Sequence, residues 1–96
     1  MLKITQIAED NTSVTIKLEG RIVGQWVNEL KKECRKYMRR RNVLILDLSG
    51  ATFADDRGIK MLSAMAGNQV RLTRCSLLLS GLLENVDGPM LEKPWV

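Results

Sequence analysis

Two aspartates, an arginine and a glycine follow one another at residues 55–58, and they are the residues of this chain best suited to chemistry. They lie in the stretch TFADDRGIKML, residues 52–62, directly after a continuous apolar run. Neighbouring carboxylates of this kind act in proteins as acid–base groups, as metal ligands or as helix caps. Which role applies depends on the elements that position them.

The sequence does not favour catalysis by Asp55 and Asp56. Successive helical residues point about 100° apart, so these carboxylates would not face each other across a substrate. The chain has no histidine, the commonest general base and metal ligand, and no Ser-x-Gly elbow or glycine-rich phosphate loop. A receiver-type pocket, in which Asp47 would accept a phosphoryl group, is not expected either. This chain is short for that fold, and its first strand turns into a hairpin. We therefore expect no enzyme, no metal site and no cofactor.

A helix cap accounts for one of the two aspartates. An aspartate at a helix start accepts hydrogen bonds from unpaired backbone N–H groups and suits the helix dipole, typically worth about 1 kcal/mol. A second acid and an arginine exceed what capping requires. We infer that the loop presents a surface that a partner recognises.

The first part of the chain predicts a hairpin and then a helix. Residues 2–8 alternate between apolar and polar, and residues 13–19 alternate more cleanly. Over residues 25–41 the apolar side chains recur every three or four residues, as in an amphipathic helix of roughly four turns.

Two strand–helix units are expected next. The apolar run at residues 42–49 predicts a central strand buried on both faces. Its exit loop is predicted at residues 47–52, with Gly50 as the turn residue. A helix is predicted from Asp56 to Asn68, and its buried side would hold Ile59, Leu62, Ala66 and Val70. A last apolar strand is predicted at residues 74–80.

The element order predicts an α/β fold with a mixed β-sheet. Strand–helix–strand units require a largely parallel sheet, and the N-terminal hairpin adds an antiparallel pair with helices packed on the sheet. We expect a single domain over residues 1–96 with a short C-terminal tail from about residue 84.

The stretch VLILDLSGATFADDRGIKMLSAM, residues 43–65, resembles the central motif of STAS domains, the fold shared by sulfate transporter tails and anti-sigma factor antagonists. In that family an apolar strand runs into Asp-Leu-Ser, and Asp-Ser-Ser/Thr-Gly opens a helix. The resemblance extends over residues 2–83 by element order. It implies a small STAS-like domain that works by binding other proteins.

The motif carries over position by position. Asp55 matches the family's aspartate and Gly58 its glycine, whereas Arg57 replaces a small hydroxyl residue. Asp56 stands where the family usually has the serine that a partner kinase phosphorylates. An aspartate cannot be modified in that way and carries about one negative charge, against ~1.5 to 2 for phosphoserine. Asp56 therefore either imitates the modified state permanently or marks a lost switch. The two carboxylates also disfavour a nucleotide phosphate at this helix start.

The family's partner surface includes this helix and its leading loop. Met61 and Met65 lie one turn apart, away from the predicted buried stripe, and methionines adapt readily to partner surfaces. Packing under a neighbouring loop is the alternative for both. The resemblance implies a partner-binding set of Asp55, Asp56, Arg57, Gly58, Lys60, Met61 and Met65, with Asn68 at its border.

The implied function is that of an anti-sigma factor antagonist, which acts by partner switching with an anti-sigma factor of the GHKL kinase type. In the family's antagonists phosphorylation weakens binding to that kinase, so a permanent imitation at Asp56 would favour a divergent partner. The alternative is a small STAS subunit that regulates the ATPase of an ABC-type lipid transporter.

The distribution of charge and hydropathy indicates which other classes of partner, such as nucleic acid or a membrane, are to be expected. The net charge is +4, and seven basic residues lie between Lys31 and Arg41. We interpret this patch as a solvated helix face, with an acidic or membrane-adjacent partner as the alternative. No aromatic set or DNA-reading motif accompanies it, so nucleic acid is not expected. No apolar stretch reaches the ~18 residues that a membrane span needs.

The two cysteines and the C-terminal tail allow predictions about the cellular compartment and about self-association. Cys34 and Cys75 fall in apolar stripes, which predicts buried thiols in a reducing compartment and hence a cytoplasmic protein. Leu91, Trp95 and Val96 either fold back onto the sheet or are covered by a partner or a second copy, so a homodimer is one expectation.

Overall fold

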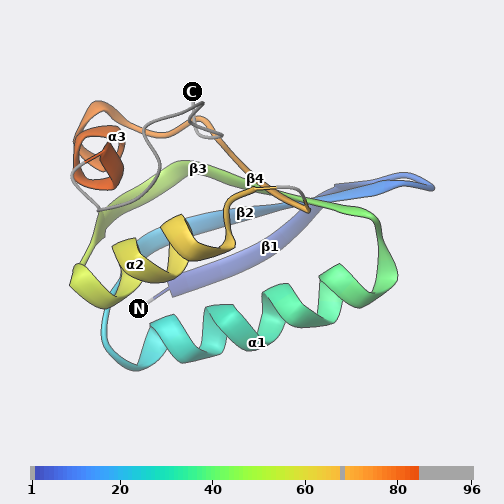
Figure 1. Ribbon diagram of the computed structural model, residues 1–96, viewed down its shortest axis with the longest axis horizontal. Coiled ribbons are helices and arrows are strands. Elements are labelled where there is room, and N and C mark those ends of the chain that lie inside the picture. Colours follow the sequence, from blue (N-terminus) through green and yellow to red (C-terminus); the bar gives the residue numbers. More distant parts are fainter. Residues whose placement is uncertain (1, 68, 85–96) are drawn as a thin grey trace.

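The computed structural model describes residues 2–67 and 69–84, which form one mixed sheet with helices packed on it (Figure 1). The elements are β1 (Leu2–Glu9), β2 (Ser13–Ile22), α1 (Gln25–Arg40), β3 (Val43–Ala54), α2 (Asp56–Met65), β4 (Val70–Thr73) and α3 (Leu77–Glu84). The strand order is β1-β2-β3-β4. The β1–β2 pair is antiparallel, and the β2–β3 and β3–β4 pairs are parallel. The predicted α/β class with an N-terminal hairpin is confirmed.

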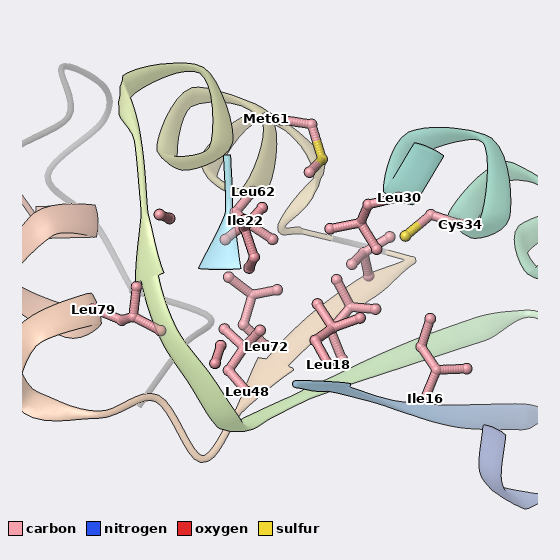
Figure 2. Packing of buried hydrophobic residues seen from close by; sticks show 14 of the residues in the cluster. Ile16, Leu18, Ile22, Leu30, Cys34, Leu48, Met61, Leu62, Leu72 and Leu79 are labelled. Atoms are coloured by element: carbon pink, nitrogen blue, oxygen red, sulfur yellow. The ribbon is translucent and has the colours of Figure 1, made fainter. Parts of the chain in front are cut away.

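The core lies between one face of the sheet and helices α1 and α2. The strand register places Val14 beside Leu44 and Ile16 beside Leu46, so the alternate residues of neighbouring strands form one continuous apolar face. Leu30 of α1 and Leu62 of α2 close over that face and are fully buried (Figure 2). The aliphatic core that the hydrophobic pattern predicts is therefore present.

The opposite face of β3 differs from expectation. Val43 and Ile45 alternate with the buried leucines and are only partly buried among the described residues. The prediction of a strand buried on both faces over residues 42–49 therefore holds at residues 46–48, where Leu46, Asp47 and Leu48 are all buried, and is wrong at Val43 and Ile45. A strand with one packed face needs apolar residues only at every second position, so the continuous run overstates burial.

The predicted exit loop at residues 47–52 is also wrong, because β3 continues to Ala54. Glu19 of β2 pairs with Gly50, and Ile22 pairs with Ala54. The pairing of β2 with β3 shifts register twice in this region, so the strand is locally distorted but does not end. Gly50 is therefore a residue of a distorted strand, not of a turn.

The predicted strand at residues 74–80 is helical instead. β4 ends at Thr73, and α3 begins at Leu77, beside the C-terminal part of β3 (Figure 1). A short run of leucines fits a strand or a buried helix equally well. The hydroxyl of Ser76 accepts a hydrogen bond from the Leu79 N–H at 3.1 Å, and this N-terminal cap favours the helix.

Helix α2 is shorter than predicted. It ends at Met65, and Val70, which was expected on its buried side, lies in β4. Asn68 lies outside the described residues, as do Leu91, Trp95 and Val96 of the predicted tail.

Gly58 marks the closest approach of α2 to the sheet. A Cβ atom added there would lie 2.4 Å from the backbone oxygen of Ile22 and 3.4 Å from Cβ of Ala54. A backbone oxygen in a paired strand cannot move aside cheaply, so only glycine fits.

We expect Gly58→Ala to lower the free energy of unfolding by about 1–3 kcal/mol, because the new methyl group must push α2 away from β2. Urea denaturation measures the change. Gly81→Ala in α3 is the matched control, since an added Cβ meets no described atom within 4 Å there. Equal stability of Gly58→Ala and the wild type would show that α2 does not approach β2 this closely.

Candidate protein-binding site at the start of helix α2

Asp55 joins the starts of two helices. It has extended backbone geometry at the N-cap of α2, and its Oδ1 accepts a hydrogen bond from the Gly58 N–H at 2.8 Å. Its Oδ2 accepts a second bond, at 2.9 Å, from the N–H of Gly24, the residue that precedes α1. The backbone N–H of Asp55 donates to the Ile22 oxygen at 3.2 Å. One side chain therefore fixes the β2–α1 loop against the β3–α2 loop.

These bonds also set the charge state of Asp55. The hydrogen bonds from Gly24 and Gly58 stabilise the carboxylate and hold the pKa of Asp55 below its usual range, and the nearby charge of Arg57 acts in the same direction. Gly24 has a φ of 55°, in the left-handed region that favours glycine, which lets its N–H face the carboxylate. Asp55 is thus an ionised structural cap at neutral pH.

Asp56 and Arg57 are exposed in the first turn of α2. The prediction that they contact a partner stays a prediction. The structure places the two aspartates in different environments: Asp55 accepts two backbone hydrogen bonds, whereas Asp56 is exposed to solvent.

A groove of about 380 Å³ separates α1 from α2 beside this loop. Arg57, Lys60, Met61 and Met65 line it on the α2 side, so the structure brings four of the predicted partner-binding residues together. Met61 is only 8% exposed and packs with the core, so of the two alternatives left open for the methionines a free second face is wrong for Met61 (Figure 2). α1 lies beside that side of α2, and Met65 is only partly buried.

Sequence reasoning missed the α1 side of the groove. Val27, Asn28 and Lys31 line it, with Ala64 of α2. The amphipathic pattern of α1 identified its buried stripe, but periodicity does not reveal which neighbour lies beside the stripe. Lys31 had been assigned only to the basic patch.

Asp47 is separate from this site. It is 4% exposed; its Oδ1 accepts a hydrogen bond from the Ser49 N–H at 2.9 Å, and its Oδ2 lies 3.9 Å from a guanidinium nitrogen of Arg74. Burial by itself raises the pKa of Asp47, but the hydrogen bonds from Ser49 and the charges of Arg74 and Lys17 outweigh it and lower the pKa. Within residues 2–67 and 69–84, no three His, Cys, Asp or Glu side chains are placed to hold a metal ion.

The C-terminal end of the basic patch is partly neutralised. Arg40 and Arg41 pair with Glu9 of β1, at 3.0 and 2.8 Å. These ion pairs tie the end of α1 to the hairpin. The patch is therefore not one uniform surface, and its N-terminal half adjoins the groove through Lys31.

The cysteines lie in different environments. Cys34 is fully buried, as predicted, and burial raises its pKa to about 12, with Glu33 adding to the effect. Cys75 is only partly buried, which corrects the expectation for that residue. Both thiols are free. Among the described helices, none is long and apolar enough to cross a lipid bilayer.

We expect Asp55→Ala to lower the free energy of unfolding by about 1–2 kcal/mol at neutral pH, because a cap and a loop hydrogen bond are lost together. The stabilisation by Asp55 is complete above the pKa of an unfolded aspartate, about 3.9, and is lost as the pH falls through the lower pKa of the folded state. The difference in the free energy of unfolding between the variant and the wild type, measured by urea denaturation, should therefore decrease as the pH is lowered into the acid range.

Asp56→Ala is the matched control for that experiment, since it removes an adjacent carboxylate that is exposed. It should change stability by less than about 0.5 kcal/mol. The assignment of the cap to Asp55 would be wrong if the two variants lost equal stability with the same pH dependence.

Comparison with known proteins identifies the fold. No family model and no curated protein sequence matches this chain. Among solved structures, the anti-sigma factor antagonist SpoIIAA in its unphosphorylated form superposes with a TM-score of 0.64. The match covers 95% of this chain and 90% of that chain at 15% sequence identity, so the likeness is one of fold. The chain therefore has the STAS fold that the motif at residues 43–65 predicted.

Proposed function

We propose that this chain is a non-enzymatic regulatory domain of the cytoplasm that binds a protein partner through the start of α2 and the α1–α2 groove. The role resembles that of an anti-sigma factor antagonist, with partner switching no longer controlled by phosphorylation at position 56. The observation that carries the proposal is the exposed Arg57, which follows the exposed Asp56 and lines a groove with an apolar floor.

The lining of the groove supports a protein partner. The partly buried Met65 supplies exposed apolar surface above the buried Val27 and Met61, and methionine side chains adapt to the shape of what they contact. Lys31, Arg57 and Lys60 place positive charge around that surface. An apolar centre within a polar rim is the usual anatomy of a protein interface.

The exposed carboxylate of Asp56 favours a partner that tolerates negative charge at this position. It is exposed, and Arg57 beside it offsets part of its charge. Its carboxylate supplies less charge and fewer acceptor oxygens than a phosphoserine would. A kinase-type anti-sigma factor that recognises an unmodified serine would therefore bind this chain weakly.

We expect Asp56→Ser to gain two properties at once. A cognate GHKL-type kinase should bind it more tightly than the wild type and then phosphorylate the new hydroxyl, which radiolabelled ATP and intact-protein mass spectrometry would detect. Asp56→Ala is the matched control, because it removes the charge without adding a hydroxyl. It should bind more tightly yet stay unmodified. If no kinase from the native cell modifies Asp56→Ser, the antagonist role loses its support.

Co-purification of the full chain from its native cell separates the proposal from the alternative. Recovery of an anti-sigma kinase supports the antagonist role, whereas recovery of an ABC ATPase assigns the domain to a transporter. We expect either partner to bind in the α1–α2 groove, so the groove variant described next tests binding of either one.

We expect Lys60→Glu to weaken binding of the co-purified partner by at least about fivefold, because the substitution reverses a charge at the rim of the groove. Isothermal titration calorimetry measures the affinity. Lys36→Glu makes the same charge change at an exposed position of α1 outside the groove and should leave the affinity within about twofold. Equal losses for both variants would place the partner elsewhere.

A further inference from the structure

A second hollow lies on the other flank of α1, between that helix and the sheet edge formed by β1. Its volume is about 330 Å³. Leu2 and Ile4 of β1 form one wall. The other wall is a stripe of α1 residues at three- and four-residue spacing, namely Trp26, Glu29, Glu33 and Tyr37.

The lining chemistry of this hollow suits a cation. Trp26 and Tyr37 are partly buried, and aromatic faces attract ammonium and guanidinium groups. The guanidinium of Arg40 already lies 5.6 Å from the centre of the Tyr37 ring, so the ring of Trp26 is the one to which we assign an incoming cation. Glu29 and Glu33 add two carboxylates, and neither forms an ion pair with the described part of the chain. Glu29 also lines a neighbouring hollow together with Lys31, Lys32 and Arg35, so the two carboxylates border a basic part of α1.

The strand beside the hollow suits an extended peptide. Within the described residues β1 pairs only with β2, so its other edge carries backbone N–H and C=O groups that a further strand could use. The pairing of β1 is regular from Leu2 to Gln6, and a bulge follows before Ala8. The regular part includes the two β1 residues that line the hollow.

Charge argues against a second copy of this chain as the occupant. A symmetric dimer through β1 would bring Glu29 and Glu33 of both copies to one interface. Such a cluster of carboxylates is repulsive, and like charges across an interface cost affinity. A basic strand meets the same surface with complementary charge.

We propose that the β1 edge and this hollow bind an extended basic segment of a partner protein. Its backbone pairs with Leu2–Gln6, and an arginine or lysine side chain enters between the ring of Trp26 and the two carboxylates. This site is separate from the groove between α1 and α2, so either can fail without the other.

The test is an NMR titration of the ¹⁵N-labelled full chain with the peptide acetyl-Thr-Val-Arg-Val-Arg-Thr-amide. We expect shifts at the amides of residues 2–6 and at the indole N–H of Trp26. A peptide with citrulline in place of both arginines keeps the shape without the charge, and should bind at least about tenfold more weakly.

The protein variants complete the design. Glu29→Gln combined with Glu33→Gln should weaken the arginine peptide by about tenfold, whereas Glu19→Gln, an acid outside the hollow, should leave its affinity unchanged. Three outcomes would overturn the proposal: equal affinity for the two peptides, shifts confined to the α1–α2 groove, or no shift at about 1 mM peptide. A dimer that the double variant strengthens would assign the edge to a second copy instead.

Discussion

The geometry of this domain depends on one carboxylate shared between two loops. Asp55 follows β3, caps α2 through the N–H of Gly58 and accepts a hydrogen bond from the N–H of Gly24 ahead of α1. These two hydrogen bonds join the starts of α1 and α2 beside the groove that lies between the helices. The close contact of Gly58 with Ile22 then sets how near α2 can approach the sheet.

Adjacent aspartates thereby have different physical roles. Asp55 is used by the backbone, and any residue that cannot accept two hydrogen bonds would loosen both helix starts. Asp56 faces solvent and contributes nothing to the core. An exposed position of this kind can change its side chain at little cost in stability.

Helix α1 divides its surface among three environments. Leu30 and Cys34 face the sheet, Lys31 faces the groove beside α2, and Glu33 faces the hollow beside β1. Charges of both signs lie on the β1 flank, because Arg40 contacts Glu9 and the ring of Tyr37 there. One helix thus contributes to the core, to the groove and to the hollow at the same time.

The sequence by itself determined the elements whose signals are local. Alternation over residues 13–19 specified a hairpin strand, and the three- and four-residue spacing over residues 25–41 specified α1, because both periods arise from backbone geometry alone. The motif at residues 43–65 indicated the STAS fold, and aspartate at the helix start indicated a cap. The class of fold and the location of the candidate site were therefore predictable.

Tertiary structure decided what depends on neighbours distant in sequence. The leucines near residue 79 became helical through a cap and through packing that a short apolar run cannot encode. Met61 is buried because α1 lies across it, and the partner of Asp55 is Gly24, 31 residues earlier. The hollow beside β1 arises only when strand and helix meet. Periodicity shows which side of an element is buried, but contacts between elements show against what.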